Sequence, residues 1–411
     1  MSRKNVTSKI KDIINSNKDI AFIIGNGVHR YCSDKIVNYK CVSWENLLLN
    51  LAKQNDLTEK IPSGISYTEF FDIFELNKWK KRIELPQYPK YDQESLINNS
   101  LFAIFNKGKL QNDLNAFKKY NILLQEQNSP IQGYTNLLGK NILAPSFEQF
   151  NNSLRKKISS CGFMESKSIP LIELFDLIIM IHQQRFVSNT KKYIQYKMRD
   201  WETNDIIKRI VTKIKELNSP LLTTNYDDVF SKSIKNLKLQ IVKNNGAKFS
   251  DIYPWNCYYS DNKSNKYTSG FGIWHINGMV KYHRSIRIGL TDYMNCISKA
   301  RQMLKGSIIF ENDEENHKNK SMYWKGYNTW IHQFFNNSLF IFGLSLDENE
   351  LFLRWLLIQR KKYYLTFAQK HNGWYITKDK LSEGKTLFLE SVGIEIIKVQ
   401  DYKTIYEDIW Q

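Results

Sequence analysis

Four short polar segments follow apolar runs in this sequence, and their side chains suit the handling of a nucleotide. They are GNG at 25–27, TNYDD at 224–228, WHING at 274–278 and GLS at 343–345. Amide and carboxylate side chains suit the hydroxyl and amide groups of a nucleoside better than a bare phosphate. A histidine titrates near neutral pH and can accept a proton as a general base. The sequence therefore predicts a nucleotide site with a base, built from segments far apart along the chain.

The first segment is a glycine turn, Gly25-Asn26-Gly27, directly after the apolar run IAFII. Glycines remove side chains where backbone N–H groups must approach a phosphate, and the following chain can present a dipole to an anion. The segment departs from the dinucleotide fingerprint G-x-G-x-x-G, because Arg30 stands where the third glycine would be. A phosphate-binding turn and a plain tight turn both remain open on this motif alone.

The polar residues after the run LLT divide between ligand binding and helix capping. Asn225 can hold a ribose hydroxyl or a water through its amide, and Asp227 can accept hydrogen bonds from an amide ligand. Both residue types also cap helices, and a helix is expected to begin near Val229. We assign Asp228 to the cap and keep Asn225 and Asp227 as candidates for ligand binding.

The other two segments supply a candidate base and a candidate hydroxyl. His275 follows Trp274 at the end of an apolar run, where it serves either as a general base or as a packing residue. Further along, Gly343 permits the close approach of a ligand and Ser345 can bond a ribose. No other histidine or cysteine stands at metal-ligand spacing from His275, so we predict no metal site.

Strands that alternate with helices must position these residues. We expect strands at 20–24, 221–224, 239–242, 272–275, 286–290, 339–344, 374–377 and 394–399. Helices are expected at 6–14, after Ser43, from Thr291 and from Asp347, where Glu350 would complete a capping box. This alternation predicts an α/β protein with a Rossmann-like, doubly wound, mostly parallel sheet. Ligands bind such sheets beyond the carboxyl ends of the strands, where the four polar segments fall.

The middle of the chain has a different pattern from its two ends. Between about 60 and 210, aromatic and charged residues mix in long helical periods with few convincing strands. We predict that residues 1–60 form the first part of the Rossmann-like domain and residues 211–411 its remainder. Residues 61–210 would form a large helical insertion or lobe between them.

Composition limits the setting in which the protein works. The chain has 411 residues and a net charge of +18, but its Lys and Arg residues are dispersed, which favours a solvated basic surface over a nucleic-acid groove. Five widely spaced cysteines argue against a disulfide framework. The apolar runs are too short for a signal peptide or a membrane span. We expect a cytoplasmic protein without membrane association, and direct nucleic-acid binding is a less favoured alternative.

Taken in order, the motifs resemble a known family, the sirtuin-like NAD+-hydrolysing proteins of bacterial anti-phage defence. The matching stretches are FIIGNGVHRY with SWENLL downstream, LLTTNYDDVF, IWHINGMV followed by IGLTDY, and LFIFGLSLDENEL. They span residues of about 20–50 and 219–400, whereas the helical middle matches no family that we can name. The resemblance implies a sirtuin-like Rossmann domain that binds NAD+ as a substrate and cleaves its nicotinamide glycosidic bond. It implies no metal and no further cofactor.

The resemblance also implies a role for each candidate residue. Asn225 would position the ribose or the attacking water, and His275 would be the base. Asp227 would face the nicotinamide amide. The remaining substrate contacts would come from two loops, with Gly25, Asn26 and Gly27 at the phosphates and Gly343 and Ser345 at the ribose.

Three departures from the family pattern fall on this site. Asn26 replaces the usual alanine between the first glycines, His29 replaces a serine, and Asn277 replaces the second histidine of an H-x-H-G turn. These changes bear on the contacts of the first loop more than on the base. The four-cysteine zinc module of true sirtuins is missing, which favours hydrolysis to nicotinamide and ADP-ribose over protein deacylation.

A toxic NAD+ glycohydrolase must be held inactive at rest, so the resemblance leads to expectations about partners. We expect a homo-oligomer and a regulatory protein encoded nearby, for example an ATPase or a nucleotide-sensing subunit, in an abortive-infection system. The alternative is a binding protein without turnover. It would be an NAD+ or ADP-ribose sensor, or a nucleic-acid-binding subunit of a defence complex that uses the charge of +18.

Overall fold

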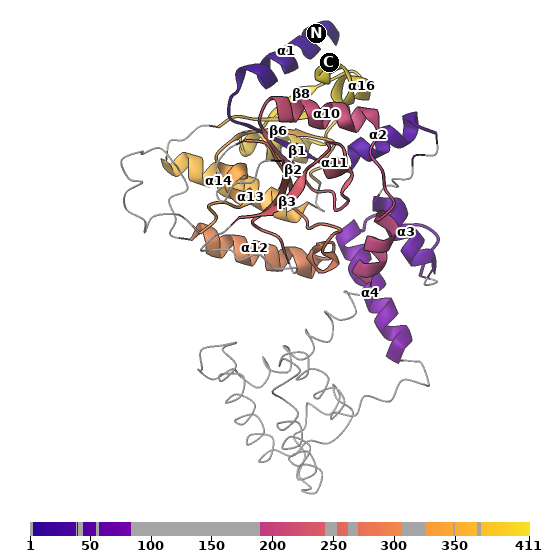
Figure 1. The fold of residues 1–411 in the computed structure, drawn as a ribbon. Coiled ribbons are helices and arrows are strands. Elements are labelled where there is room, and N and C mark those ends of the chain that lie inside the picture. The colour runs from indigo at the N-terminus through magenta and orange to yellow at the C-terminus, as the bar shows by residue number, and fades with distance from the viewer. Residues whose placement is uncertain are drawn as a thin grey trace, which may run out of the picture. The chain divides into compact units, whose positions relative to one another are not determined.

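The computed structural model describes most of the chain outside its middle (Figure 1). The described residues are 3–37, 39, 44–54, 57–83, 190–242, 253–261, 270–305, 325–347, 350–367 and 371–411. The chain divides into two compact units, Met1–Phe74 with Lys191–Gln411, and Glu75–Thr190. The first unit carries the sheet and includes residues 61–74 and 191–210 of the predicted insertion. Residues 84–189 lie outside the described residues, so their helical character stays a prediction.

One sheet organises the first unit, with eight strands among the described residues in the order β3-β4-β5-β2-β1-β6-β7-β8. The strands are β1 Ile20–Ile24, β2 Pro220–Thr223, β3 Lys238–Ile241, β4 Cys257–Ser260, β5 Gly272–His275, β6 Ser338–Phe342, β7 Gly373–Thr377 and β8 Glu395–Lys398. From β5 to β8 every neighbouring pair is parallel, whereas β3 and β4 add an antiparallel edge. The predicted Rossmann-like, mostly parallel α/β fold is confirmed.

Strand β1 lies in the middle of this sheet although it comes from the N-terminal end of the chain. It pairs in parallel with β2 on one side and with β6 on the other, so that Phe22 has Leu221 and Phe340 as its register partners. All five residues of β1 are buried, as expected for a strand covered on both faces. The expectation that the first strand joins the later ones is therefore confirmed.

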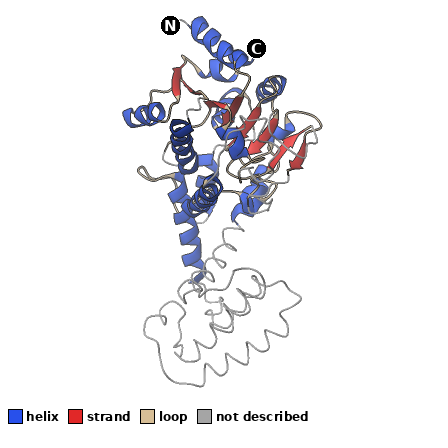
Figure 2. Cartoon of the chain, turned by 90° about the vertical axis from the view of Figure 1, so that its left-hand side faces the viewer, coloured by secondary structure: helices blue, strands red, loops and turns tan. Residues whose placement is uncertain are grey.

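Helices cover both faces of the sheet, as Figures 1 and 2 show. On one face lie α1 Arg3–Ser16, α10 Asp205–Glu216, α16 Tyr402–Tyr406 and the 3-10 turn η3 Asp408–Trp410. On the other face lie α12 Leu290–Leu304, α13 Trp330–Phe335 and α14 Leu351–Phe367. The remaining described elements are α2 Gly27–Lys35, α3 Trp44–Gln54, α4 Tyr67–Ile83, α11 Val229–Lys232, η1 His283–Ser285 and α15 Glu383–Ser391.

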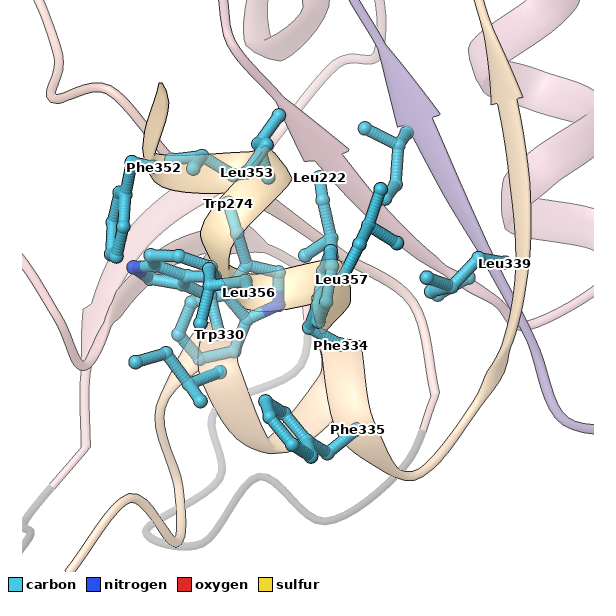
Figure 3. Close-up of a cluster of buried hydrophobic side chains, with 14 of the residues drawn as sticks. Leu222, Trp274, Trp330, Phe334, Phe335, Leu339, Phe352, Leu353, Leu356 and Leu357 are labelled. Atoms are coloured by element: carbon cyan, nitrogen blue, oxygen red, sulfur yellow. The ribbon is translucent and has the colours of Figure 1, made fainter. Parts of the chain in front are cut away.

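Successive side chains of β1 point to opposite faces of the sheet and pack in two separate hydrophobic cores. Phe22 packs against Trp410 of η3 on the first face, with ring centroids 5.7 Å apart. Ile23 belongs to the cluster on the second face, where α13 and α14 pack on the strands. Figure 3 shows this cluster, in which Trp330 of α13 and Leu357 of α14 lie over the strands. Each fully buried side chain of this size contributes about 1.5–3 kcal/mol relative to an exposed one.

The strand predictions differ from the structure at two places near β5: one predicted strand is absent and one observed strand was not predicted. Residues 286–290 form no strand but cross the carboxyl ends of the strands and lead into α12. Ile286 and Ile288 are buried there, but Arg287 between them donates its N–H to the carbonyl of Asn277, a loop residue, at 2.8 Å. Strand β4 was not predicted, because its sequence CYYS has polar and aromatic residues on both faces. Alternation alone identified neither feature.

No described helix has the length and apolar character needed to span a bilayer. Among the same residues no group of three or more His, Cys, Asp or Glu side chains is arranged to hold a metal ion. Cys32, Cys257 and Cys296 are buried free thiols in the described part of the chain. Burial raises the pKa of the Cys257 thiol to about 12, so it stays protonated and unreactive at neutral pH.

Glycine is required in the loop that follows β5. Gly278 has a φ of +94°, and a Cβ there would lie 2.0 Å from the carbonyl oxygen of Ser285. We predict that Gly278→Ala lowers the free energy of unfolding by about 2–3 kcal/mol or more, through backbone strain and this clash. Gly384→Ala on α15 is the matched control, because its Cβ would meet nothing within 4 Å.

The control should stabilise the protein by about 0.4–1 kcal/mol, since alanine restricts the unfolded chain more than glycine does. Denaturant unfolding of both variants and wild type measures the two effects. Equal midpoints for wild type and Gly278→Ala would contradict the prediction.

Candidate functional site

A cavity of about 550 Å³ opens at the carboxyl ends of the parallel strands. Its volume is in the range of about 300–1,000 Å³ that is usual for small-molecule sites. Loops after five strands contribute to its wall: Asn26 and Gly27 after β1, Thr224 and Tyr226 after β2, Asn277 after β5, Gly343 to Ser345 after β6, and Asp379 and Lys380 after β7. This is the position at which open parallel sheets bind ligands.

The glycine turn after β1 packs directly against the loop after β6. Gly27 donates its N–H to the carbonyl of Gly343 at 2.8 Å. A Cβ at Gly25 would lie 2.6 Å from the Gly343 carbonyl oxygen, and one at Gly27 would lie 2.8 Å from the Gly343 Cα. Gly343 itself has a φ of +65°, a conformation that favours glycine. These glycines are therefore needed for the contact between two strand-end loops, of which Gly27 and Gly343 also line the cavity.

Asn26, between the two glycines, presents an unused donor. It lies in the cavity wall, and its buried Nδ2 atom has no hydrogen-bond partner among the described residues. A buried amide without a partner costs free energy, and a ligand acceptor would satisfy it. Asn26 therefore has a side-chain donor that can bind a ligand oxygen.

Asn225 connects the ends of three neighbouring strands. Its Nδ2 donates to the carbonyl of Gly25 after β1 at 3.4 Å, and its own carbonyl accepts from Nδ1 of His275 in β5 at 2.9 Å. Its backbone N–H donates to Oγ1 of Thr223 at 3.1 Å. The side-chain Oδ1 is buried and has no hydrogen-bond partner in the described part of the chain. Asn225 thus keeps one acceptor for a hydroxyl or a water.

The contact with Asn225 fixes the tautomer of His275. A carbonyl oxygen can only accept, so Nδ1 of His275 carries the proton and Nε2 has a lone pair. Nε2 is buried without a hydrogen-bond partner among the described residues. Burial lowers the pKa of His275 below its usual value, although the Asn225 bond and the charges of Asp227 and Asp228 partly oppose this. His275 is therefore a neutral imidazole with an available base.

Both carboxylate oxygens of Asp227 are already bonded. One accepts from Nε2 of His29 at 3.0 Å, and the other accepts from the backbone N–H of Val229 at 3.1 Å. Burial raises the pKa of Asp227, but the bonds and the charge of His29 outweigh it and hold the pKa below its usual value. Asp228 is the N-cap residue of α11, as predicted, although the hydrogen bond to the first helical N–H comes from the Asp227 carboxylate. The Asp228 carboxylate instead pairs with Lys232 at 2.9 Å.

His29 contacts several residues inside the protein. The side chain is fully buried on α2, and its Nδ1 lies 3.0 Å from the hydroxyl of Tyr39. Its ring stacks on Phe230 and meets the edge of Trp201. Through Nε2 it joins the loop after β1 to Asp227 after β2. His29 therefore acts here as the partner of Asp227 within the protein.

The structure sorts the predicted site residues into two groups. Asn26, Gly27, Gly343 and Ser345 line the cavity, and Gly25 packs directly behind them. Asn225, Asp227 and His275 lie deeper, with exposed fractions of 2%, 1% and 1%. Their chain neighbours Thr224, Tyr226 and Asn277 form the cavity wall in front of them. The expected base and its asparagine are therefore in contact with each other but sealed from the cavity.

Glu350 is a cavity residue that sequence reasoning placed elsewhere. Helix α14 begins at Leu351 rather than at Asp347, so the predicted capping box is wrong. The Glu350 carbonyl accepts the first helical bond from Arg354, while its half-buried carboxyl bonds the side chain of Asn277. Burial and the charge of Asp347 raise the pKa of Glu350 to about 8. The acidic string DENE was the available signal, but it fits a helix start equally well.

A second set of cavity residues lies near the C-terminus. Tyr402, Ile405 and Tyr406 of α16 line the cavity, and Tyr406 lies beside the glycine turn. Sequence reasoning assigned them no role. The stretch YKTIYED follows the last strand and has no motif that would mark it as part of a site.

The sheet and its strand-end cavity define a Rossmann-like α/β protein. Comparison with known families agrees, since residues 219–397 match the model of the SIR2-like domain. The match covers less than half of the chain, runs from β2 to β8 and includes Asn225, His275 and Ser345. No curated protein matches the chain. The match supports the sirtuin-like resemblance of this segment and is compatible with an NAD+-related activity.

The raised pKa of Glu350 predicts a pH-dependent stability. The folded protein holds this proton up to about pH 8, whereas the unfolded chain releases it near the ordinary value of 4.5. Stability contributed by the protonated group is therefore lost as pH rises from about 5 to about 8. Glutamine has the shape of the protonated glutamate and does not titrate. The free energy of unfolding of Glu350→Gln should therefore rise steadily relative to that of wild type over this interval.

Denaturant unfolding at several pH values, without ligand, measures this difference. Glu390→Gln, at an exposed position on α15, is the control and should run parallel to wild type. If Glu350→Gln also runs parallel to wild type, the carboxyl is not protonated in the folded protein.

Proposed function

We propose that this protein is a regulated NAD+ glycohydrolase that cleaves NAD+ to nicotinamide and ADP-ribose. In this proposal it works in the cytoplasm as the toxic effector of a bacterial anti-phage, abortive-infection system. The observation that carries the enzymatic part is the pair formed by Asn225 and His275, whose contact leaves Nε2 as an unbonded base. The SIR2-like match of the segment that holds both residues supports NAD+ as the ligand.

The pair has the chemical features that hydrolysis of a nicotinamide glycosidic bond needs. The bond from C1′ of the ribose to the ring nitrogen breaks, and its electron pair neutralises the cationic ring of the departing nicotinamide. A water forms the new C1′–O bond and gives its proton to Nε2 of His275, which passes it to solvent. Asn225 Oδ1 can orient that water or a ribose hydroxyl. Orientation and proton acceptance suffice because the leaving group departs with oxocarbenium character at C1′.

The cavity wall has groups that suit the rest of the dinucleotide. Asn26 offers a donor, and Ser345 is exposed at the wall after β6. Arg30 and Lys380 lie in the same wall and can pair with phosphate groups, although Asp34 and Asp379 also line it. In the proposal, NAD+ lies in this cavity as a substrate and is the only nucleotide required.

The sealed position of the base is the observation that supports regulation. Asn225 and His275 are almost fully buried, so the nicotinamide end of NAD+ reaches them only if the wall in front of them moves. A toxic enzyme at rest requires such a state. We include in the proposal a homo-oligomer and a regulatory partner protein encoded nearby, with ATPase or nucleotide-sensing activity, that controls this change.

The same observation favours a second candidate, a sensor that binds NAD+ or ADP-ribose without turnover. In that case the wall stays closed and the cavity alone holds the ligand. Calorimetry of NAD+ binding, followed by analysis of the recovered nucleotide, separates the two. Intact NAD+ after saturation, with and without the co-expressed neighbouring proteins, would favour the sensor.

Removal of the base should abolish hydrolysis. We predict that His275→Ala lowers the rate of nicotinamide release at least about 100-fold, the lower end of what general base catalysis contributes. His371→Ala is the matched control, since His371 precedes β7 and so lies at the amino ends of the strands, away from the cavity at their carboxyl ends. Nicotinamide release from NAD+ by purified protein, alone and with its neighbours, measures both. Full activity in His275→Ala would contradict the assignment.

The lowered pKa of His275 predicts the acid limb of the pH profile. The base works when neutral, so kcat/KM should stay level until the pH falls below 6.5, the ordinary value, and then decline. Asp228→Asn should move the decline to still lower pH, because the Asp228 charge raises this pKa. Profiles in a Glu350→Gln background separate the titration of Glu350. A decline that begins above pH 6.5 would exclude His275 as the base.

A further inference from the structure

The C-terminal segment 401–411 forms part of the cavity, although it follows the end of the SIR2-like match at residue 397. Its helix α16 lies beside α2 and β7, which carry other parts of the cavity wall. Tyr406 is one of its three lining residues. Only 3% of this side chain is exposed, yet it lines the cavity.

The hydroxyl of Tyr406 lies where the two glycine loops meet. A Cβ at Gly27 would be 2.6 Å from this oxygen, and a Cβ at Gly343 would be 3.0 Å from it. The hydroxyl therefore occupies the front of the turn at which backbone N–H groups and a helix N-terminus can receive an anion. Side chains on either glycine would displace it.

Packing holds the Tyr406 ring in this orientation. It stacks on Tyr31 of α2 with centroids 4.8 Å apart and an interplanar angle of 26°, and it contacts Phe342 at the end of β6. Asp401 caps α16 by accepting from the N–H of Thr404 at 2.8 Å. A hydroxyl that is already oriented loses little entropy when it binds a ligand.

The hydroxyl keeps its proton and faces a cavity whose wall has acidic residues, among them Asp34 and Asp379, as well as basic ones. Burial raises the pKa of Tyr406 far above its usual value, so the group is a donor at any cellular pH. Arg30 and Lys380 line the same cavity. An O–H donor at the glycine turn suits a phosphate oxygen, which is a strong, charged acceptor.

We propose that Tyr406 binds the diphosphate of the nucleotide, its hydroxyl donating a hydrogen bond to a phosphate oxygen at the Gly27–Gly343 contact. The C-terminal segment 401–411 is then part of the substrate site and completes it from outside the matched domain. The inference rests on the proposed function for the identity of the ligand, a dinucleotide diphosphate such as NAD+ or ADP-ribose. It does not depend on turnover.

The test compares ligands with and without a diphosphate. Tyr406→Phe removes only the hydroxyl and keeps the ring that stacks on Tyr31. We expect its affinity for ADP-ribose, measured by calorimetry, to fall at least about tenfold, as for a lost hydrogen bond to a charged group. Its affinity for adenosine should change less than about twofold. Tyr364→Phe is the control, because that hydroxyl donates to the carbonyl of Phe335 far from the cavity wall.

Each outcome bears on the inference separately from the proposed function. Equal ADP-ribose affinity in wild type and Tyr406→Phe would overturn the inference, whatever the rate of nicotinamide release. Equal losses for ADP-ribose and adenosine would show a general change of shape and would overturn it as well. If wild type binds neither ADP-ribose nor NAD+, the ligand is wrong and both fail. Selective loss for ADP-ribose without nicotinamide release would support Tyr406 and reject the glycohydrolase.

Discussion

The contact on which this structure depends is the close approach of the loops after β1 and β6. Gly27 donates its N–H to the carbonyl of Gly343, and no side chain could fit between the two loops. This approach lets β1, from the N-terminal end of the chain, lie between β2 and β6 with their ends level. It also leaves backbone without side chains at the carboxyl ends of these strands, and the hydroxyl of Tyr406 lies against this backbone. One packing constraint thus determines the shape of the cavity wall at this point.

Deeper in the protein, a series of buried polar contacts determines the protonation of His275. His29 holds Asp227, and Asn225 holds Nδ1 of His275. Because burial disfavours the imidazolium, the remaining nitrogen is an acceptor rather than a donor. Each donor or acceptor used for this purpose is lost to the ligand, and Asp227 has both oxygens committed. Among Asn225, Asp227 and His275, few hydrogen-bonding atoms therefore remain available to a ligand, and Nε2 of His275, a proton acceptor, is one of them.

The strands of this fold could be predicted from sequence because buried parallel strands are continuous apolar runs, as IAFII and LFIF are. The same rule failed at residues 286–290, where the Arg287 N–H bonds a loop carbonyl instead of a strand. Asn225 and His275 could be placed at strand ends because the apolar runs before them stop there. The burial of these two residues could not be predicted, because it depends on their neighbours Thr224, Tyr226 and Asn277, which line the cavity in their place. Glu350 was missed because capping and cavity lining favour the same residue type.

The loop after His275 is also bound by both chain segments that connect to the second compact unit. Asp72, just before that unit, accepts from the N–H of Leu290, and Lys191, just after it, pairs with Asp292 at 2.8 Å. Asp292 in turn pairs with Arg287, whose N–H bonds the carbonyl of the cavity residue Asn277. Polar contacts therefore link both connecting segments to the loop that meets the cavity wall at Asn277. The proposed function requires this wall to move, and one backbone hydrogen bond and two ion pairs connect the neighbouring loop to both segments that lead to the second unit.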